Sequence, residues 1–154
     1  MSTLIHKRVI ECRNGEYPKA VCQVRSGWVV LGDVQFLPGY SLLLPDPVVA
    51  NLNELTGEAR SCFLEDMTLL GDAVLELTNA VRINYEILGN VEPALHAHVF
   101  PRFDDEPEDL KLKPVWFYDW KAAPEFDTNR DTPFMDKLRD KLIALGIAQS
   151  DSVE

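Results

Sequence analysis

The chain of 154 residues lacks any long hydrophobic run, and it contains little cysteine, histidine or basic side chain. No apolar stretch approaches the roughly 18 residues that are needed to cross a bilayer. The first residues, Met1-Ser-Thr-Leu-Ile-His-Lys-Arg, lack the apolar segment of a secretory signal. We therefore expect a cytoplasmic protein with no membrane partner.

Positive charge is scarce, because 25 Asp and Glu residues outnumber 15 Lys and Arg residues and leave a net charge of -10. Proteins bind a nucleic-acid backbone through clustered Lys and Arg side chains. The composition therefore argues against a nucleic-acid partner. An anionic small molecule would need a local pocket that is positive or rich in hydrogen-bond donors.

The three cysteines, Cys12, Cys22 and Cys62, are odd in number and show no Cys-x-x-Cys spacing. This pattern indicates reduced thiols, and it predicts neither a disulfide framework nor a structural zinc site. The chain also lacks internal repeats, low-complexity tracts and linkers. Its length suits a single domain over residues 1–154.

Short strands separated by glycine and proline are predicted in the first third of the chain. Residues 20–24 and 28–31 predict a hairpin about Ser26-Gly27, and residues 40–44 predict a third strand after the Pro38-Gly39 turn. Residues 1–19 are polar and irregular, so we expect a loop there. Together the strands favour an antiparallel meander.

Two helices are expected. The first begins after Thr56 as N-cap and runs to about Asn79, with one apolar stripe that consists of Ala59, Phe63, Met67, Leu70, Val74, Leu77 and Val81. The second has Thr132 as N-cap, Pro133 at its first position and Gly146 past its end. The tail from Gln149 is expected to be disordered.

The segment between the two helices contains a further predicted strand at residues 82–88 and an acidic run at residues 104–109. We expect the acidic run to be a mobile and inert surface segment. Residues 113–120 are dense in aromatic side chains. They either cover an edge of the core or border a ligand site.

Two of the three histidines lie close together in residues 93–102. In a strand, His96 and His98 point to one face with Ala94 and Phe100, and the residues between them point to the core. The residue types alone leave four hypotheses open. The histidines are structural, they bind a metal that needs a third ligand, one of them is a catalytic nucleophile, or they bind an anion without turnover.

The residues around the two histidines resemble the signature of the histidine triad (HIT) family. The resemblance covers roughly residues 12–120. It is carried by Asp33, Pro38-Gly39, the long helix, Asn84, Leu88-Gly89-Asn90, Pro93, Leu95-His96-Ala97-His98-Val99-Phe100-Pro101-Arg102 and Pro114-Val115-Trp116. The first histidine of the family's triad is replaced by Ala94.

The resemblance implies an α+β fold with an antiparallel sheet of about five strands, one long helix across it and a C-terminal helical extension at about residues 130–146. It also implies a homodimer without cofactor or metal. The implied activity is that of a bacterial-type HIT hydrolase similar to diadenosine polyphosphate hydrolases. The substrate would be a dinucleoside polyphosphate, such as diadenosine tetraphosphate, or a nucleoside phosphoramidate.

The resemblance also implies residue roles. His96 is the nucleophile that forms a nucleotidyl-histidine intermediate, and His98 helps to hold the phosphate. Substrate contacts are implied for Asp33 at the ribose, although it is offset by one residue, and for Asn84, Asn90, Arg102 and Trp116. Arg102 has the alternative role of a surface ion pair with the acidic segment. Ala94 leaves a second hypothesis, a nucleotide-binding or regulatory protein with weak or no catalysis.

Overall fold

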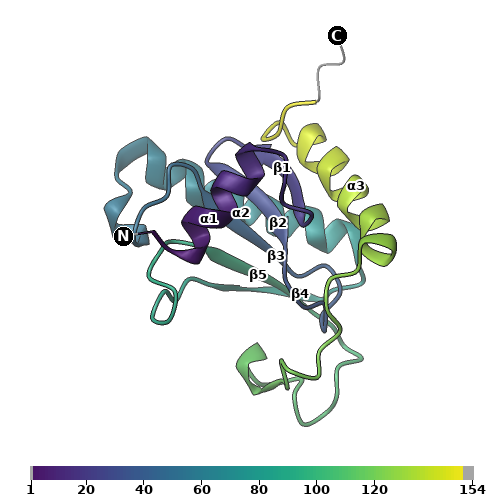
Figure 1. Ribbon diagram of the computed structural model, residues 1–154. Helices are drawn as coiled ribbons and strands as arrows, with labels where there is room; N and C mark the ends of the chain where they lie inside the picture. Colours follow the sequence, from purple (N-terminus) through teal and green to yellow (C-terminus); the bar gives the residue numbers. More distant parts are fainter. Residues whose placement is uncertain (1, 151–154) are drawn as a thin grey trace.

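The computed structural model describes residues 2–150 and has a five-stranded antiparallel sheet with helices on both faces (Figure 1). The strand order is β1-β2-β3-β5-β4. The strands are β1 (Ala20–Val24), β2 (Gly27–Leu31), β3 (Ser41–Pro45), β4 (Arg82–Glu86) and β5 (Ala97–Arg102). The helices are α1 (Leu4–Arg13), α2 (Gly57–Leu77) and α3 (Thr128–Ala144), with short 3₁₀ turns at Leu52–Glu54 and Val115–Phe117. The predicted α+β class is confirmed.

The predicted hairpin forms between β1 and β2 and continues into β3. Gly27 begins β2 where that strand lies against β3, and a Cβ atom there would lie 1.9 Å from the carbonyl oxygen of Leu44. Only glycine permits so close an approach of two backbones. β3 then pairs with β5, which places the histidine segment inside the sheet instead of at its edge.

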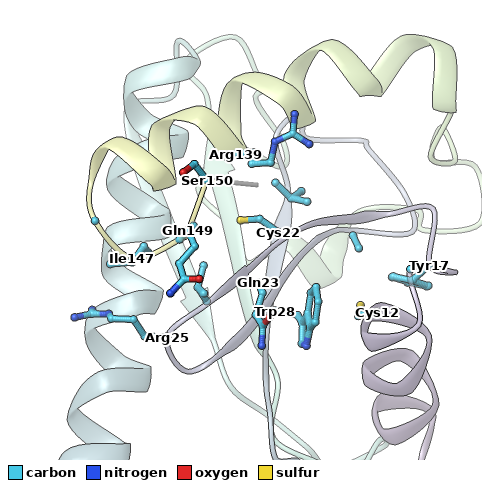
Figure 2. A pocket seen from close by; sticks show the side chains of 16 residues that line it. Cys12, Tyr17, Cys22, Gln23, Arg25, Trp28, Arg139, Ile147, Gln149 and Ser150 are labelled. Atoms are coloured by element: carbon cyan, nitrogen blue, oxygen red, sulfur yellow. The ribbon is translucent and has the colours of Figure 1, made fainter. Parts of the chain in front are cut away.

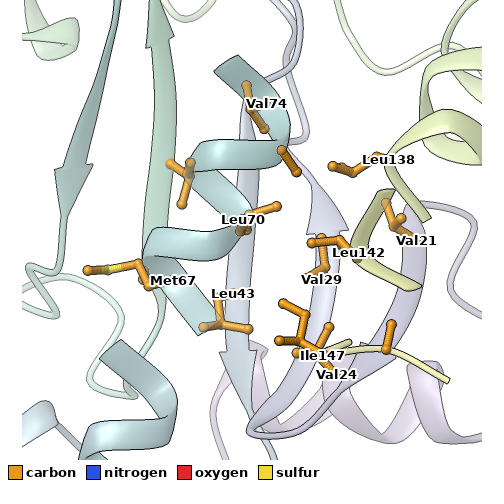
Figure 3. Packing of buried hydrophobic residues seen from close by; sticks show 14 of the residues in the cluster. Val21, Val24, Val29, Leu43, Met67, Leu70, Val74, Leu138, Leu142 and Ile147 are labelled. Atoms are coloured by element: carbon orange, nitrogen blue, oxygen red, sulfur yellow. The ribbon is translucent and has the colours of Figure 1, made fainter. Parts of the chain in front are cut away.

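One face of the sheet packs against α2 and α3 (Figure 3). Leu70 and Val74 of α2 and Leu138 of α3 are fully buried among side chains of β1, β2, β3 and β5. The predicted stripe of the long helix is confirmed over its central part. Its two ends are corrected, because Ala59 is exposed and Val81, 57% exposed, lies beyond the helix, which ends at Leu77.

The expected loop over residues 1–19 is wrong for its first part, because Leu4–Arg13 form α1. Thr3 caps this helix together with His6 in a reciprocal capping box, which satisfies backbone groups that a helix start leaves unpaired. Ile5, Val9 and Cys12 are buried at spacings of four and three. The polar side chains that suggested a loop are the solvent face of this helix.

α1 covers the other face of the sheet, opposite α2 (Figure 1). Its buried side chains join Leu42 and Leu44 of β3, Tyr40 before it and Phe100 of β5. Aromatic residues that follow β5, including Tyr118 and Trp120, pack against the same cluster. These aromatics therefore cover part of the core. This is the first of the two hypotheses for residues 113–120.

The C-terminal helix begins earlier than predicted. Asp127 is its N-cap and accepts a hydrogen bond from the backbone N–H of Arg130 at 2.8 Å. Pro133 therefore lies inside the helix, where it lacks the N–H that would bond to the carbonyl of Asn129. Gly146 follows the helix end with φ of 83°, as predicted. Of the tail expected to be disordered, residues 151–154 lie outside the described residues.

Within residues 2–150, no helix is both long enough and apolar enough to span a membrane.

Candidate functional site

The two histidines lie at the start of β5, an internal strand between β3 and β4. His98 is the register partner of Leu42 in β3 and of Glu86 in β4, and His96 immediately precedes the strand. Ala94 and Phe100 are buried on the α1 face, whereas Leu95, Ala97 and Val99 are buried on the α2 face. The alternation predicted from the sequence is thus confirmed.

His96 is held by the backbone two residues before it. Its Nδ1 lies 2.7 Å from the carbonyl oxygen of Ala94, and the residue is only 9% exposed. A carbonyl oxygen accepts hydrogen bonds and cannot donate them, so Nδ1 must carry the proton. In the uncharged ring, the other nitrogen, Nε2, then has the lone pair. A neutral imidazole in this state is a nucleophile.

His98 is held from the neighbouring strand. Its Nδ1 lies 2.6 Å from the hydroxyl oxygen of Tyr40, and its ring stacks on Phe100 with centroids 5.4 Å apart. Burial, together with the nearby His96 at a ring distance of 5.0 Å, lowers the pKa of His98 to about 4. His98 is consequently uncharged at neutral pH.

Trp116 borders the histidines. Its ring meets that of His98 edge-on at 5.6 Å and stacks on Trp120 at 5.0 Å, yet the residue is 42% exposed. Its Nε1 donates a hydrogen bond to the carboxylate of Glu86. Sequence reasoning missed Glu86, because its place beside His98 depends on the register between β4 and β5.

Arg102 and Asn84 belong to a buried polar network on the same face of β5. The Arg102 guanidinium binds the Glu106 carboxylate at 2.9 Å and donates to Asn84 Oδ1 at 2.8 Å. The ion pair with the acidic segment exists, but it is buried rather than on the surface, since Arg102 and Glu106 are each 7% exposed. Glu106 also accepts hydrogen bonds from the Tyr118 hydroxyl and the Phe103 backbone.

This network corrects the expectation that residues 104–109 are inert. Burial by itself would raise the pKa of Glu106, but the hydrogen bonds from Arg102, Tyr118 and Phe103 outweigh it and lower that pKa. The carboxylate therefore stays charged opposite Arg102. The two groups fix the start of the segment that carries Trp116.

The Asp33 carboxylate forms ion pairs with two basic side chains. Its carboxylate oxygens lie 2.7 Å from Arg8 of α1 and 2.8 Å from Lys19. Burial would raise the pKa of Asp33, and its hydrogen bonds and ion pairs with Lys19 and Arg8 lower it overall. Within residues 2–150, Asp33 makes no hydrogen bond to either site histidine. Arg8 was missed because the sequence pattern did not predict α1.

A cavity of about 200 Å³ lies beside His96. It is lined by Ala50, Asn51, Ile87, Leu88, Gly89, Pro93, Ala94, Leu95 and His96. Asn90 is exposed in the loop before β5 and does not line this cavity. The structure therefore brings Ala94 and His96 to one cavity. Asn90 follows the lining residue Gly89 in the sequence but is not part of the lining.

A larger cavity lies elsewhere. It has a volume of about 860 Å³ and lies along the edge strand β1, between the end of α1 and residues 146–150 (Figure 2). Its lining includes Cys12, Trp28 and Ile147 but neither site histidine. Size alone does not mark the site in this molecule.

Metal binding by the histidines needs a third ligand. Within residues 2–150, no group of three or more His, Cys, Asp and Glu side chains is placed to hold a metal ion. The donor set around His96 and His98 thus consists of ring nitrogens, a carbonyl and a phenol.

Comparison with known proteins identifies the fold. No family model matches the sequence. No curated protein matches it either. Solved structures do match. A histidine triad protein from Marinobacter aquaeolei has a TM-score of 0.74 at 22% identity, covering 94% of this chain and 99% of that one.

Two further structures agree. A HIT protein from Sinorhizobium meliloti has a TM-score of 0.70 at 22% identity over 80% of this chain and 88% of its own. A hypothetical histidine triad nucleotide-binding protein from Sulfolobus tokodaii has a TM-score of 0.67 at 16% identity over 88% and 91%. The chain therefore has the fold of histidine triad proteins.

Proposed function

We propose that this chain is a nucleotide-binding hydrolase of the histidine triad family that cleaves its substrate through a nucleotidyl-histidine intermediate on His96. One observation carries the proposal. The Ala94 carbonyl holds the Nδ1–H of His96, so Nε2 is the nitrogen that remains to attack phosphorus, and the neighbouring His98 ring is uncharged. The fold shared with proteins named for histidine triads and nucleotide binding supports it.

The reaction has two displacements. In the first, His96 Nε2 attacks the α-phosphorus of a dinucleoside polyphosphate, an N–P bond forms, and the P–O bond to the remaining phosphate chain breaks with its electron pair on that oxygen. In the second, water attacks the same phosphorus, loses a proton to solvent, and displaces Nε2 to release a nucleoside monophosphate. With a phosphoramidate, a P–N bond breaks and the amine takes up a proton. Such loose transition states need positioning and hydrogen-bond donors above all.

The proposed substrate-binding residues differ in their exposure and in the hydrogen bonds and ion pairs that they already make. Trp116 is the substrate contact that the geometry favours, because it is partly exposed and edge-on to His98. Asn84 and Arg102 act by holding the segment that carries Trp116, since each is engaged in the buried network. Asp33 would contact the substrate while it is ion-paired with Arg8 and Lys19. Asn90 would contact it from the exposed loop before β5.

A second candidate is a nucleotide-binding protein with little turnover. Ala94 favours it, because its fully buried methyl group offers no donor where the family's triad has its first histidine. However, the backbone of Ala94, not its side chain, holds His96. Ala94→His separates the two candidates. A gain of turnover identifies a weakened enzyme, whereas nucleoside monophosphate binding without turnover in either form identifies a binder.

The test of the first candidate is His96→Ala. We expect turnover of a dinucleoside polyphosphate panel to fall by at least about a thousandfold, as for other removed nucleophiles, while circular dichroism stays unchanged. His6→Ala is the matched control, because the His6 ring hydrogen-bonds to Thr3 at the start of α1 and to neither site histidine. Undiminished hydrolysis by the His96 variant would refute the proposal.

We also propose a homodimer that forms through β4. This strand ends the sheet, so one row of its backbone groups has no strand partner within residues 2–150. Tyr85 is exposed on this strand, and Val81 is exposed immediately before it. Antiparallel pairing of two β4 strands about Asn84 would set Arg82 opposite Glu86 of the second copy, which is a favourable cross-strand pair.

A further inference from the structure

Tyr40 is built tightly into the site. The residue is 3% exposed, and its ring stacks on Phe100 with centroids 4.2 Å apart. On another side it packs against Gly32, where a Cβ atom would lie 2.2 Å from the tyrosine ring carbons. The phenol is thus held so that its hydroxyl lies 2.6 Å from His98 Nδ1.

The hydrogen bond between Tyr40 and His98 has only one satisfactory direction. Within residues 2–150, His98 is the one hydrogen-bond partner of the Tyr40 hydroxyl. If Nδ1–H donated to the phenol, the phenolic proton would be buried without an acceptor, which is unfavourable. If the phenol donates to Nδ1, both groups are satisfied. Burial also raises the pKa of Tyr40, so the phenolic proton is retained.

The charged groups near the phenol do not alter this direction. Asp33 disfavours loss of the phenolic proton and Arg8 favours it, but these two side chains are ion-paired with each other. Glu86 also disfavours a phenolate, and its carboxylate is bound by Trp116. The net effect of the surroundings keeps Tyr40 a donor.

We propose that Tyr40 is a positioning residue that fixes His98 in the Nε2–H tautomer, opposite to the Nδ1–H tautomer of His96. Each histidine then has Nε2 as its remaining nitrogen, because Nδ1 is engaged in both. His96 offers a lone pair and His98 offers an N–H. The catalytic use of this difference, attack on phosphorus by one ring and donation to a phosphoryl oxygen by the other, rests on the proposed function.

The direct test is the tautomeric state of the wild-type protein. The chain has only three histidines, so two-bond ¹H–¹⁵N correlation spectra of ¹⁵N-labelled protein at neutral pH are simple to assign. We expect the Nε2–H pattern for His98 and the Nδ1–H pattern for His96. A His98 ring protonated on Nδ1, or one that averages both tautomers, would overturn the proposal, and this result needs no variant to fold.

Tyr40→Phe then tests the cause. The substitution keeps the ring packing and removes only the hydroxyl, so His98 should change from one tautomer to a mixture. We expect kcat to fall about 10- to 100-fold, as when the partner of a metal-bound histidine is removed, with KM little changed. Tyr17→Phe is the matched control, because the buried Tyr17 hydroxyl has no hydrogen-bond partner within residues 2–150. An unchanged His98 pattern in Tyr40→Phe would contradict the assignment.

These experiments separate this inference from the proposed function. If the tautomers are as expected but His96→Ala still turns over substrate, the role of Tyr40 stands and the nucleophilic role of His96 fails. If His98 has the other tautomer while His96→Ala is inactive, the reverse holds.

Discussion

At the scale of single residues, the chemistry of the site depends on keeping His98 uncharged beside the proposed nucleophile. His98 lies among aromatic rings and beside His96, and both features disfavour its charged form. An uncharged His98 binds an anion through its N–H group instead of through net charge. This solves the difficulty that a protein with a net charge of -10 has in binding a phosphate.

The state of His98 is open to direct measurement. We expect its ring to titrate at about 4 in the folded protein, against about 6.5 in an unfolded chain. Because the folded pKa is the lower one, His98 contributes stability above pH 6.5 that is lost as the pH falls toward 4. NMR titration of its ring C–H signals checks this. A midpoint near 6.5 in the folded protein would contradict it.

The shared face of the two histidines could be predicted from the sequence, but the residues that hold them could not. The alternation in residues 93–102 predicts that His96 and His98 share a face, because side-chain direction in a strand is a local property. The partners that select their tautomers are not local. Tyr40 is 58 residues away from His98, and the place of Glu86 depends on strand register.

At the scale of elements, α1 matters because it brings Arg8 to Asp33 and closes the core on the histidine face. The sequence pattern did not predict α1, because only three of its ten residues are buried and the apolar pattern is weak. The long helix and the strands were predictable because their apolar patterns are strong. The start of α3 was not predictable. Pro133 suggested the first turn of the helix, but the helix begins five residues earlier, at Thr128.

Two isoleucines of α1 allow a matched test of its packing. Ile5 is 2% exposed and Ile10 is 51% exposed. We expect Ile5→Ala to lower the free energy of unfolding by about 2–5 kcal/mol and Ile10→Ala by about 0.5 kcal/mol or less. Urea denaturation measures both. Equal effects of the two substitutions would show that α1 does not pack on the sheet as described.

At the scale of the whole molecule, the open edge at β4 is the surface that a second copy would extend. We expect sedimentation equilibrium to show a dimer and Arg82→Glu to weaken it about thirtyfold, because two symmetry-related pairs each change by roughly 1 kcal/mol. Lys7→Glu is the control, since it makes the same charge change on α1, away from β4. A monomeric wild type, or a dimer that Arg82→Glu leaves intact, would exclude this interface.

The central claim is that the substrate phosphorus is transferred to His96 before water attacks. Each in-line displacement inverts the configuration at phosphorus, so two displacements retain it and a single attack by water inverts it. The direct measurement is the stereochemical course of hydrolysis of a substrate made chiral at the α-phosphorus with sulfur and an oxygen isotope. Our account predicts retention in the nucleoside monophosphate product, and inversion would contradict it.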